Sequence, residues 1–245
     1  GTENVLRACC VQNVPYVVYT SSIAAVGPNT SCEPMLSGNE DTKYSGEVEL
    51  PYGKTKAMAE KLVFEANGKK LNNGGKLATC IIRPNAVYGE KSIFLQEMYL
   101  LAKARNGVLN YLEPETTERN YTYVGNVAWM HVLAARNLQL KPDLLAGQVY
   151  YSYDDTPTRK CFLIRHQLLS FMDPSIKLGS HIPYWKMWLM IQLNRIIKVI
   201  LYPFRKPQPF LNLPSLNMIV TTFCYETDKA SRHFGYKPLF TWKES

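Results

Sequence analysis

Two apolar runs on either side of a helix pattern limit this chain to a small set of folds. Residues 14–20 form a continuous apolar and aromatic run, and residues 77–83 form a second one that stops at Pro84. Between the two runs, Pro51 suits the first turn of a helix, and apolar residues follow at helical spacing as far as Gly68. Uninterrupted apolar strands are typical of parallel sheets that are covered on both faces. The sequence therefore predicts an α/β fold with a doubly wound parallel sheet.

The rest of the chain gives weaker signals for its elements. We expect helices and strands on either side of a polar loop, and a smaller, mostly helical domain for the substrate toward the Pro-rich end. The expected segments are a helix over 2–12, a loop over 27–50, a helix over 93–106, a helix from 127 to 138 and a strand over 148–153.

Tyr52 and Lys56 form the pair of residues that carries the chemistry. Residues four apart on a helix lie on nearly the same face, so the lysine ammonium can stand beside the phenol. A free phenol has a pKa of about 10, and a neighbouring cation favours its ionised form. Ser21 and Ser22 end the first strand, where a hydroxyl can hydrogen-bond a substrate oxygen. These groups predict proton transfer at an alcohol or ketone, although an ordinary solvated helix face also carries such pairs.

The order of these landmarks resembles the extended short-chain dehydrogenase/reductase family, whose sheet is Rossmann-like. A strand ending in two serines, a helix with Tyr52 and Lys56, and a second strand leading into residues 83–89 follow the family's arrangement. The resemblance implies that Ser22, Tyr52 and Lys56 are the catalytic set. Ser22 is preferred to its neighbour because Gly27 follows it by five positions, as in the family's pattern.

The same resemblance implies NAD as the cofactor. Its expected contacts are Tyr52, Lys56, Pro84, Asn85 and Val87, the last three lying in the segment that runs past the nicotinamide. The chain contains no Gly-x-Gly-x-x-Gly motif, which the family places after its first strand to bind the pyrophosphate. We therefore expect a fragment that lacks this turn and has little activity by itself. The choice between NAD and NADP depends on a ribose-proximal residue in the same missing part.

Two longer segments indicate the class of substrate. Residues 123–134 and 147–157 are similar to the 3β-hydroxysteroid dehydrogenase/Δ5-Δ4 isomerase branch, and residues 39–42, 129–131 and 228–242 are similar to its C27 type. The resemblance implies oxidation of the 3β-hydroxyl of a Δ5-steroid to the 3-oxo-Δ4 product. For the C27 type, the substrate is a 7α-hydroxylated sterol of bile acid synthesis.

Two polar landmarks in these segments have more than one interpretation. Asn126 is expected to contact the substrate, with a role as helix cap before Val127 as the alternative. Asp154 and Asp155 could be a pair of acid/base carboxylates, but Thr156 and the proline after it favour a turn.

The domain organisation follows from the family resemblance. Residues 1–90 are expected to be the C-terminal part of the NAD-binding Rossmann-like domain. Residues 91–245 are expected to form a substrate-binding region with some returning Rossmann elements.

Composition excludes several other functions. The chain has 245 residues, 46% of them hydrophobic, and a formal net charge of +8, but no concentrated basic run, so nucleic acid is not an expected partner. The six cysteines form no Cys-x-x-Cys motif and have no histidine at metal spacing, so we expect a reducing compartment and no metal. A homo-oligomer stays open.

Residues 184–204 are the best candidate for a membrane contact. The segment is long enough to span a bilayer, but Arg195 and Lys198 together cost roughly 5 to 6 kcal/mol at the centre of a membrane helix, and the apolar residues return only about 4. Leu189, Leu193 and Ile196 lie on one stripe with polar residues opposite, which suits a helix in the membrane interface. The alternative is an amphipathic helix packed on its own domain. The family is usually located in the endoplasmic reticulum membrane, with a fraction in the mitochondrial membrane.

Two rival functions stay open, a close one within the extended dehydrogenases and one of a different class. A sterol C4-decarboxylating dehydrogenase or a nucleotide-sugar epimerase would share Ser22, Tyr52 and Lys56. A non-catalytic nucleotide-binding or membrane scaffold would not need all three residues.

Overall fold

The structure is a computed structural model that describes residues 1–201 and 211–245. The chain divides into two compact units. Unit 1 consists of three stretches, Gly1–Glu90, Arg119–Arg159 and Phe223–Ser245. Unit 2 consists of Lys91–Glu118 and Lys160–Thr222. The functional division at residue 90 stays a prediction.

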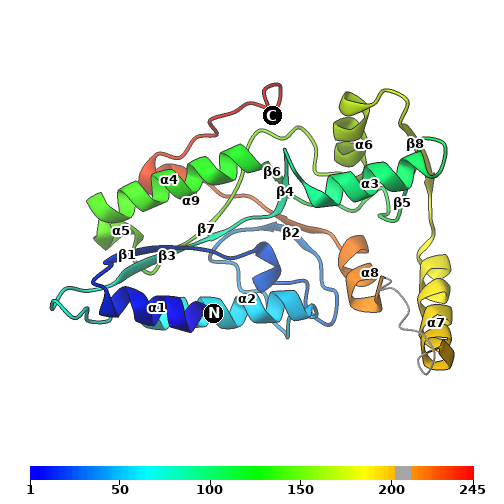
Figure 1. Ribbon diagram of the computed structural model, residues 1–245. Helices are drawn as coiled ribbons and strands as arrows, with labels where there is room; N and C mark the ends of the chain where they lie inside the picture. The colour runs from blue at the N-terminus through cyan, green and yellow to red at the C-terminus, as the bar shows by residue number, and fades with distance from the viewer. Residues whose placement is uncertain (202–210) are drawn as a thin grey trace. The chain divides into compact units, whose positions relative to one another are not determined.

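A parallel sheet forms the centre of unit 1 (Figure 1). Its strands β1 (Tyr16–Thr20), β3 (Ala78–Arg83) and β7 (Val149–Tyr151) run in the order β1-β3-β7. The register pairs Thr20 with Ile82 and Arg83 with Tyr151, so the carboxyl ends of all three strands lie at one edge. The predicted parallel sheet is confirmed, but among the described strands β1 lies at an edge and β3 in the middle.

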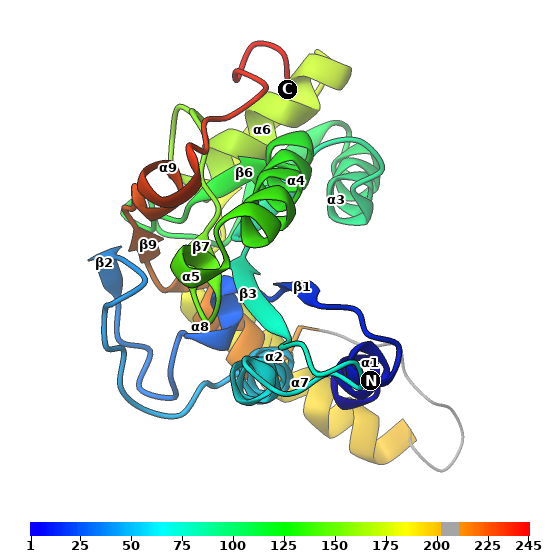
Figure 2. The ribbon, with the colours of Figure 1, turned by 90° about the vertical axis from the view of Figure 1, so that its left-hand side faces the viewer.

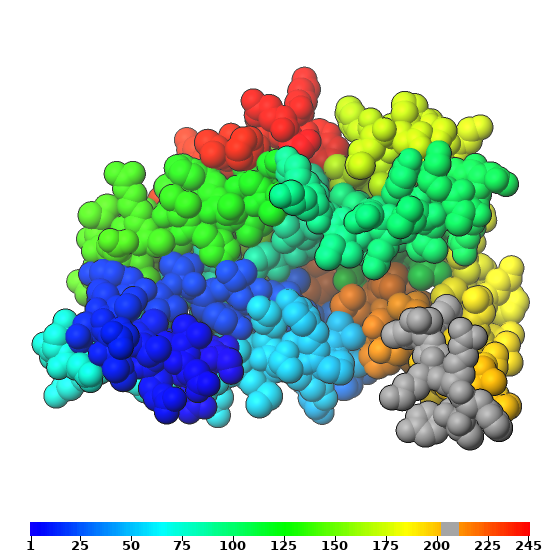
Figure 3. All heavy atoms as spheres, in the orientation of Figure 1, coloured from blue at the N-terminus to red at the C-terminus, as the bar shows by residue number. Residues whose placement is uncertain are grey.

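Helices cover both faces of this sheet (Figure 2). On one face lie α1 (Thr2–Val11) and α2 (Pro51–Ala66), which form one continuous surface, blue to cyan, in Figure 3. On the other face lie α4 (Val124–Leu140), α5 (Pro142–Leu145) and α9 (Lys229–Phe234).

Side chains alternate between the two layers along each strand, as a pleated backbone requires. Ile81 and Val149 pack with the residues of α1 and α2. Cys80, Ile82 and Tyr150 pack with the residues of α4, α5 and α9. This alternation decides which helix each side chain of the sheet can reach.

Short parallel pairs complete unit 1. The strand β2 (Met35–Gly38) pairs with β9 (Phe223–Tyr225), and β4 (Ala86–Tyr88) pairs with β6 (Tyr121–Tyr123). A single turn of 3-10 helix, η1 (Ile23–Ala25), follows β1. The expectation of an uninterrupted loop over 27–50 is therefore wrong, because β2 lies within it.

Unit 2 contains α3 (Ile93–Lys103), β5 (Val108–Tyr111), α6 (Cys161–Met172), β8 (Lys177–His181), α7 (Tyr184–Leu201) and α8 (Leu213–Val220). The strands β5 and β8 pair in parallel. Inside the unit, the buried carboxylate of Glu113 accepts a hydrogen bond from the Arg165 guanidinium at 2.5 Å. The last three residues of the predicted membrane segment, 202–204, lie outside the described residues.

Among the described residues, the helix α7 packs through the side that carries Met187 and Ile191. Met187 and Ile191 are buried in a cluster with Leu216 of α8. The opposite side is apolar and open, with Trp185 61%, Val199 76% and Ile200 64% exposed. Within residues 1–201 and 211–245, no helix combines the length and the apolar character needed to cross a bilayer.

Candidate active site

The predicted pair of Tyr52 and Lys56 meets at the carboxyl end of β1. The helix α2 places the Lys56 Nζ 5.9 Å from the centroid of the Tyr52 ring and 5.4 Å from the centroid of the Tyr19 ring. The same ammonium donates a hydrogen bond of 2.9 Å to the backbone carbonyl of Thr20. The Tyr52 ring is 56% exposed, so a ligand can reach it. This arrangement holds a cation beside an accessible phenol, within the range of a cation–π contact.

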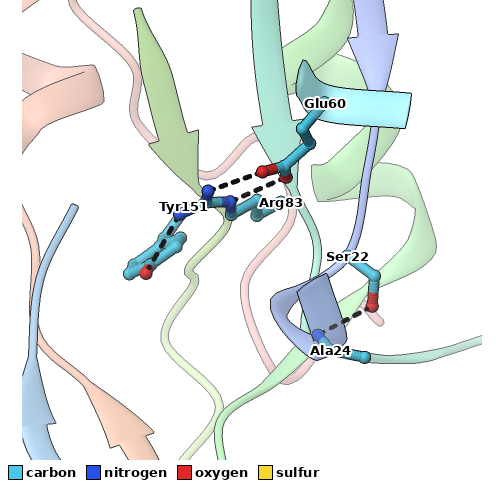
Figure 4. Close-up of polar contacts among 5 residues, drawn as sticks. All are labelled: Ser22, Ala24, Glu60, Arg83 and Tyr151. Carbon is cyan, nitrogen blue, oxygen red and sulfur yellow. Dashed lines mark hydrogen bonds and ion pairs between the residues drawn. The ribbon is translucent and has the colours of Figure 1, made fainter. Parts of the chain in front are cut away.

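Ser22 lies directly after β1 and caps the short helix η1. Its Oγ accepts a hydrogen bond of 3.2 Å from the backbone N–H of Ala24, as Figure 4 shows. Accepting this bond leaves the hydroxyl proton of Ser22 available as a donor. The side chain is only partly buried, so it can serve a substrate oxygen.

Gly53 explains how α2 comes so close to the segment that carries Ser22. Gly53 is buried, and a Cβ at this position would overlap with the carbonyl oxygen of Ala24 and a methyl group of Val48. Only the smallest residue allows this approach of helix and backbone. The residue next to Tyr52 therefore sets the separation between the phenol and the serine segment.

The end of β3 supplies the segment predicted to contact the cofactor. Pro84 is buried and its carbonyl accepts a hydrogen bond of 2.9 Å from the backbone N–H of Ile23, while Val87 is 40% exposed. Both polar atoms of the Asn85 amide are buried without a hydrogen bond of ordinary geometry in the described chain, although the hydroxyl of Tyr225 lies beside them. A buried amide that is poorly satisfied by the protein is suited to a polar ligand.

A buried ion pair fixes α2 against the end of β3 (Figure 4). Glu60, one turn beyond Lys56, accepts hydrogen bonds from Arg83 at 2.8 Å from Nε and 2.6 Å from Nη2. The Arg83 Nη1 also donates to the hydroxyl of Tyr151 at 3.4 Å. The side chains of Glu60 and Arg83 are 6% and 14% exposed. This two-pronged contact joins the helix that carries Tyr52 to the segment that begins at Pro84.

Asn126 holds the C-terminal segment through its buried side chain. Its side chain is fully buried, and its Oδ1 accepts hydrogen bonds from the backbone N–H groups of Leu239 and Phe240, each at 2.9 Å. Its Nδ2 donates to the carbonyl of Phe240 at 2.9 Å and to Asp154 at 3.2 Å. The structure thus leaves no polar atom of Asn126 for a substrate. The alternative of a cap before Val127 is wrong as well, because α4 begins at Val124.

Asp154 has the turn geometry that the sequence favoured. Its Oδ1 accepts hydrogen bonds from the backbone N–H and the hydroxyl of Thr156, at 3.1 and 2.6 Å. Its Oδ2 accepts from the backbone N–H of Tyr123 at 2.7 Å. These bonds fix the start of α4 and the turn after β7.

Three residues near Lys56 were missed in the sequence. Tyr19 and Thr20 contact the Lys56 ammonium, and the Thr20 hydroxyl lies 2.8 Å from Nε2 of His131. Thr20 and Tyr19 belong to the run of hydroxyl-bearing residues that ends the first strand, which was a usable signal. His131 lies 111 residues further on, and nothing in the local sequence indicates its contact with Thr20.

All six cysteines lie in the described part of the chain, and no disulfide joins them. Burial raises the pKa of the Cys80 thiol to about 12, so this group remains a neutral part of the core.

Comparison with known proteins identifies the relatives of this chain. The pattern of the 3-beta hydroxysteroid dehydrogenase/isomerase family matches residues 1–178. The mouse and human proteins named 3 beta-hydroxysteroid dehydrogenase type 7 are each 43% identical to the chain, over 247 and 249 residues. A monkeypox virus protein named 3 beta-hydroxysteroid dehydrogenase/Delta 5-->4-isomerase is 36% identical over 240 residues. The chain aligns over 98% to 100% of its length and spans 67% of each of these three relatives.

Solved structures support the fold. An NAD-dependent NDP-hexosamine 5,6-dehydratase, TunA, superposes with a TM-score of 0.62 at 18% identity, covering 99% of this chain and 64% of that one. A UDP-glucuronic acid 4-epimerase from Bacillus cereus superposes with a TM-score of 0.62 at 16% identity, covering 98% of this chain and 62% of that one. At such low identity these structures confirm the Rossmann-like α/β fold alone. Since the family pattern and the whole-length relatives agree, the chain belongs to the 3-beta hydroxysteroid dehydrogenase/isomerase family.

Proposed function

We propose that the full-length protein oxidises the 3β-hydroxyl of a Δ5-steroid to the 3-oxo-Δ4 product, with NAD as the acceptor. The observation that carries this proposal is the Lys56 ammonium, which is hydrogen-bonded to Thr20 and lies beside the accessible ring of Tyr52. The names of the relatives support a steroid as the substrate.

The residues at the carboxyl ends of β1 and β3 fit NAD. Ligands of open parallel sheets bind at this edge, and here it presents the Lys56 ammonium, the Asn85 amide and the exposed Val87. When bound there, NAD supplies an acceptor for the hydride that leaves C3 of the steroid. Lys56 would also hydrogen-bond the nicotinamide ribose, and the segment of Pro84 to Val87 would hold the nicotinamide. Lys56, Asn85 and Val87 thus give the cofactor a charged contact, a polar contact and an apolar contact.

The protein's own residues would accept the proton of the 3β-hydroxyl. Tyr52 acts as the general base and takes the proton of the 3β-hydroxyl through its phenolic oxygen. The Lys56 ammonium stabilises the negative charge that this role requires. Ser22 donates its free hydroxyl proton to the steroid oxygen and orients it toward Tyr52. Oxidation makes the C4 protons acidic, which favours the later shift of the double bond from Δ5 to Δ4.

The more specific proposal is a 7α-hydroxylated C27 sterol of bile acid synthesis. Its support is the resemblance of residues 39–42, 129–131 and 228–242 to the C27 type. In the structure, Glu40 of the first segment accepts hydrogen bonds from the Tyr151 backbone N–H and the Thr227 hydroxyl, at 2.8 and 2.7 Å. Glu40 therefore links the end of β7 to Thr227.

The experiment offers the purified full-length protein NAD and one alcohol at a time. The panel contains a 7α-hydroxylated 3β-hydroxy-Δ5 C27 sterol, the same sterol without its 7α-hydroxyl, its 3α epimer and UDP-glucose. We expect NADH and a 3-oxo-Δ4 product, identified by the ultraviolet absorbance of its conjugated enone, with the first sterol as the best substrate. Equal rates with both 3β sterols would remove the 7α specificity alone. NADH formation with the 3α epimer or UDP-glucose, but with neither 3β sterol, would overturn the activity.

We also propose that α7 lies in the interface of a membrane, and that this membrane is the endoplasmic reticulum with a fraction in mitochondria. The support is the open apolar side of α7, together with a helix sequence that contains basic residues and no acidic ones. Sterols dissolve in membranes, so attachment at the surface would bring the enzyme to its substrate.

Vesicle flotation tests the membrane proposal. Trp185→Asp together with Ile200→Asp should strongly reduce binding to vesicles that contain anionic phospholipid. A matched control is Val132→Asp together with Leu140→Asp, which changes two exposed apolar residues of α4 and should leave flotation unchanged. Undiminished flotation of the α7 variant would remove α7 as the contact. Imaging of the tagged protein in cells tests the location, and a cytosolic distribution would contradict it.

A further inference from the structure

Thr20 is linked to a different helix on each face of the central sheet. Its backbone carbonyl accepts the hydrogen bond from Lys56 of α2, at 2.9 Å. Its hydroxyl lies 2.8 Å from Nε2 of His131, which belongs to α4 on the opposite face. The alternation along β1 explains both directions. Val18 packs with the α4 layer and Tyr19 with the α2 layer, so the Thr20 side chain again points toward α4.

The hydrogen bonds of His131 fix the direction of each proton. Its Nδ1 lies 2.8 Å from the carbonyl oxygen of Val127, which can only accept, so Nδ1 carries the proton. In a neutral ring Nε2 is then an acceptor, and the Thr20 hydroxyl donates to it. Burial lowers the pKa of His131, which favours the neutral ring. His131 is therefore a fixed acceptor that anchors the last residue of β1.

We propose that His131 and Thr20 form a positioning pair that holds the carbonyl of Thr20 under the Lys56 ammonium. The proposal rests on the proposed function and deepens it. Neither residue touches the reacting atoms. Their effect passes through Lys56, whose place beside Tyr52 depends on where the Thr20 carbonyl lies. Without the anchor, the end of β1 keeps its backbone pairing with β3 but loses its link to α4, so Thr20 is held less firmly and the ammonium spends less time beside the phenol.

The test uses Thr20→Val, which keeps the branched shape but removes the hydroxyl, in the full-length protein. We expect the rate of steroid oxidation to fall about three- to tenfold, as for the loss of one hydrogen bond. The pH at which this rate is half-maximal should rise by about 0.5 to 1 unit, because a less constrained ammonium helps the phenol less. Thr20→Ser retains the hydroxyl and should restore both values.

A double-mutant cycle separates positioning from general damage. His131→Phe should reproduce the effects of Thr20→Val, and the double variant should be no worse than either single one, because both break the same link. His233→Phe is the matched control. His233 also bonds a hydroxyl through its ring, that of Tyr150 at 3.0 Å, but at α9. This variant should lower stability without moving the pH profile.

A second readout needs no substrate. The tyrosinate absorbance of each protein is titrated with pH, and the titration of the matching Tyr52→Phe protein is subtracted. The midpoint of this difference should rise in Thr20→Val if the pair positions Lys56. An unchanged midpoint, a pH profile like that of the unsubstituted protein, or additive effects in the cycle would overturn the positioning pair. If the unsubstituted protein oxidises no 3β-hydroxysteroid, the proposed function fails, whereas the difference titration still decides the positioning pair.

Discussion

At the scale of single residues, some polar side chains of this chain are exposed to a ligand, and others are buried and hydrogen-bonded within the fold. Tyr52 is 56% exposed, whereas Asn126 is fully buried and all its polar atoms bond within the chain. Both residues lie in segments that the family resemblance marks as important. Exposure and hydrogen bonding distinguish Tyr52, a candidate base, from Asn126, a structural residue. Their spacing in the sequence does not.

Asn126→Ala should destabilise the protein by about 2 to 4 kcal/mol, because two partly buried backbone N–H groups lose their acceptor. Chemical denaturation of the full-length protein measures this loss. Asn137→Ala on the same helix is the control, since Asn137 makes one bond to a carbonyl within the helix and should cost about 1 kcal/mol or less. A stable Asn126→Ala protein with a strongly raised KM for the steroid would instead restore the substrate role.

Gly53→Ala gives a second test at this scale. In a helix interior, replacing glycine by alanine normally stabilises the helix by about 1 kcal/mol. Here the added methyl group overlaps with the carbonyl of Ala24, so we expect α2 to move from the Ser22 segment and activity to fall about tenfold or more. Met58→Ala, at a site 70% exposed, should leave activity within about twofold. A fully active Gly53→Ala protein would contradict the close approach.

At the scale of elements, the sequence predicted what depends on local pattern. The two apolar runs correspond to β1 and β3, and the helix after Pro51 corresponds to α2. Tyr52 and Lys56 both lie in the first half of α2. The three-residue strands β4, β6 and β9 are too short to produce a period. The pairing of β2 with β9 joins residues almost two hundred positions apart, and no local signal carries such a contact.

The same limit explains what was missed in the site. Lys56 and Tyr52 are four residues apart on one helix, so their contact was predictable. His131 reaches Thr20, and Asn126 reaches Phe240, only through tertiary packing across more than a hundred residues. Predictions that used local spacing were therefore reliable for the Tyr–Lys pair and wrong for the cap role of Asn126.

The Glu60–Arg83 pair is the main electrostatic link between α2 and β3. Glu60→Ala should lower the free energy of unfolding by about 3 to 5 kcal/mol, because it leaves a buried guanidinium without its partner. Glu65→Ala is the matched control on the same helix. Its carboxylate is 51% exposed and lies 3.9 Å from Lys61, so the loss should be about 0.5 kcal/mol or less. Similar losses for both variants in urea denaturation would show that the buried pair has no special role.

At the scale of the whole molecule, the groups proposed to move the proton all belong to unit 1. Ser22, Tyr52, Lys56 and the segment after Pro84 come from the first 90 residues, so their mutual geometry is set within that unit. The open apolar side of α7 belongs to unit 2. The proposed chemistry and the proposed membrane contact can therefore be tested by separate substitutions.

The proposed reaction depends above all on the phenol of Tyr52, which takes the proton of a steroid alcohol with the support of Lys56. The most direct measurement is single-turnover oxidation of a 3β-hydroxy-Δ5 sterol by the full-length Tyr52→Phe protein, with Tyr16→Phe, a partly exposed tyrosine of β1, as the control. We expect Tyr52→Phe to slow hydride transfer about a hundred- to ten-thousandfold while sterol binding persists, and Tyr16→Phe to behave like the unsubstituted protein. A Tyr52→Phe protein that turns over at nearly the normal rate would show that this phenol is not the general base.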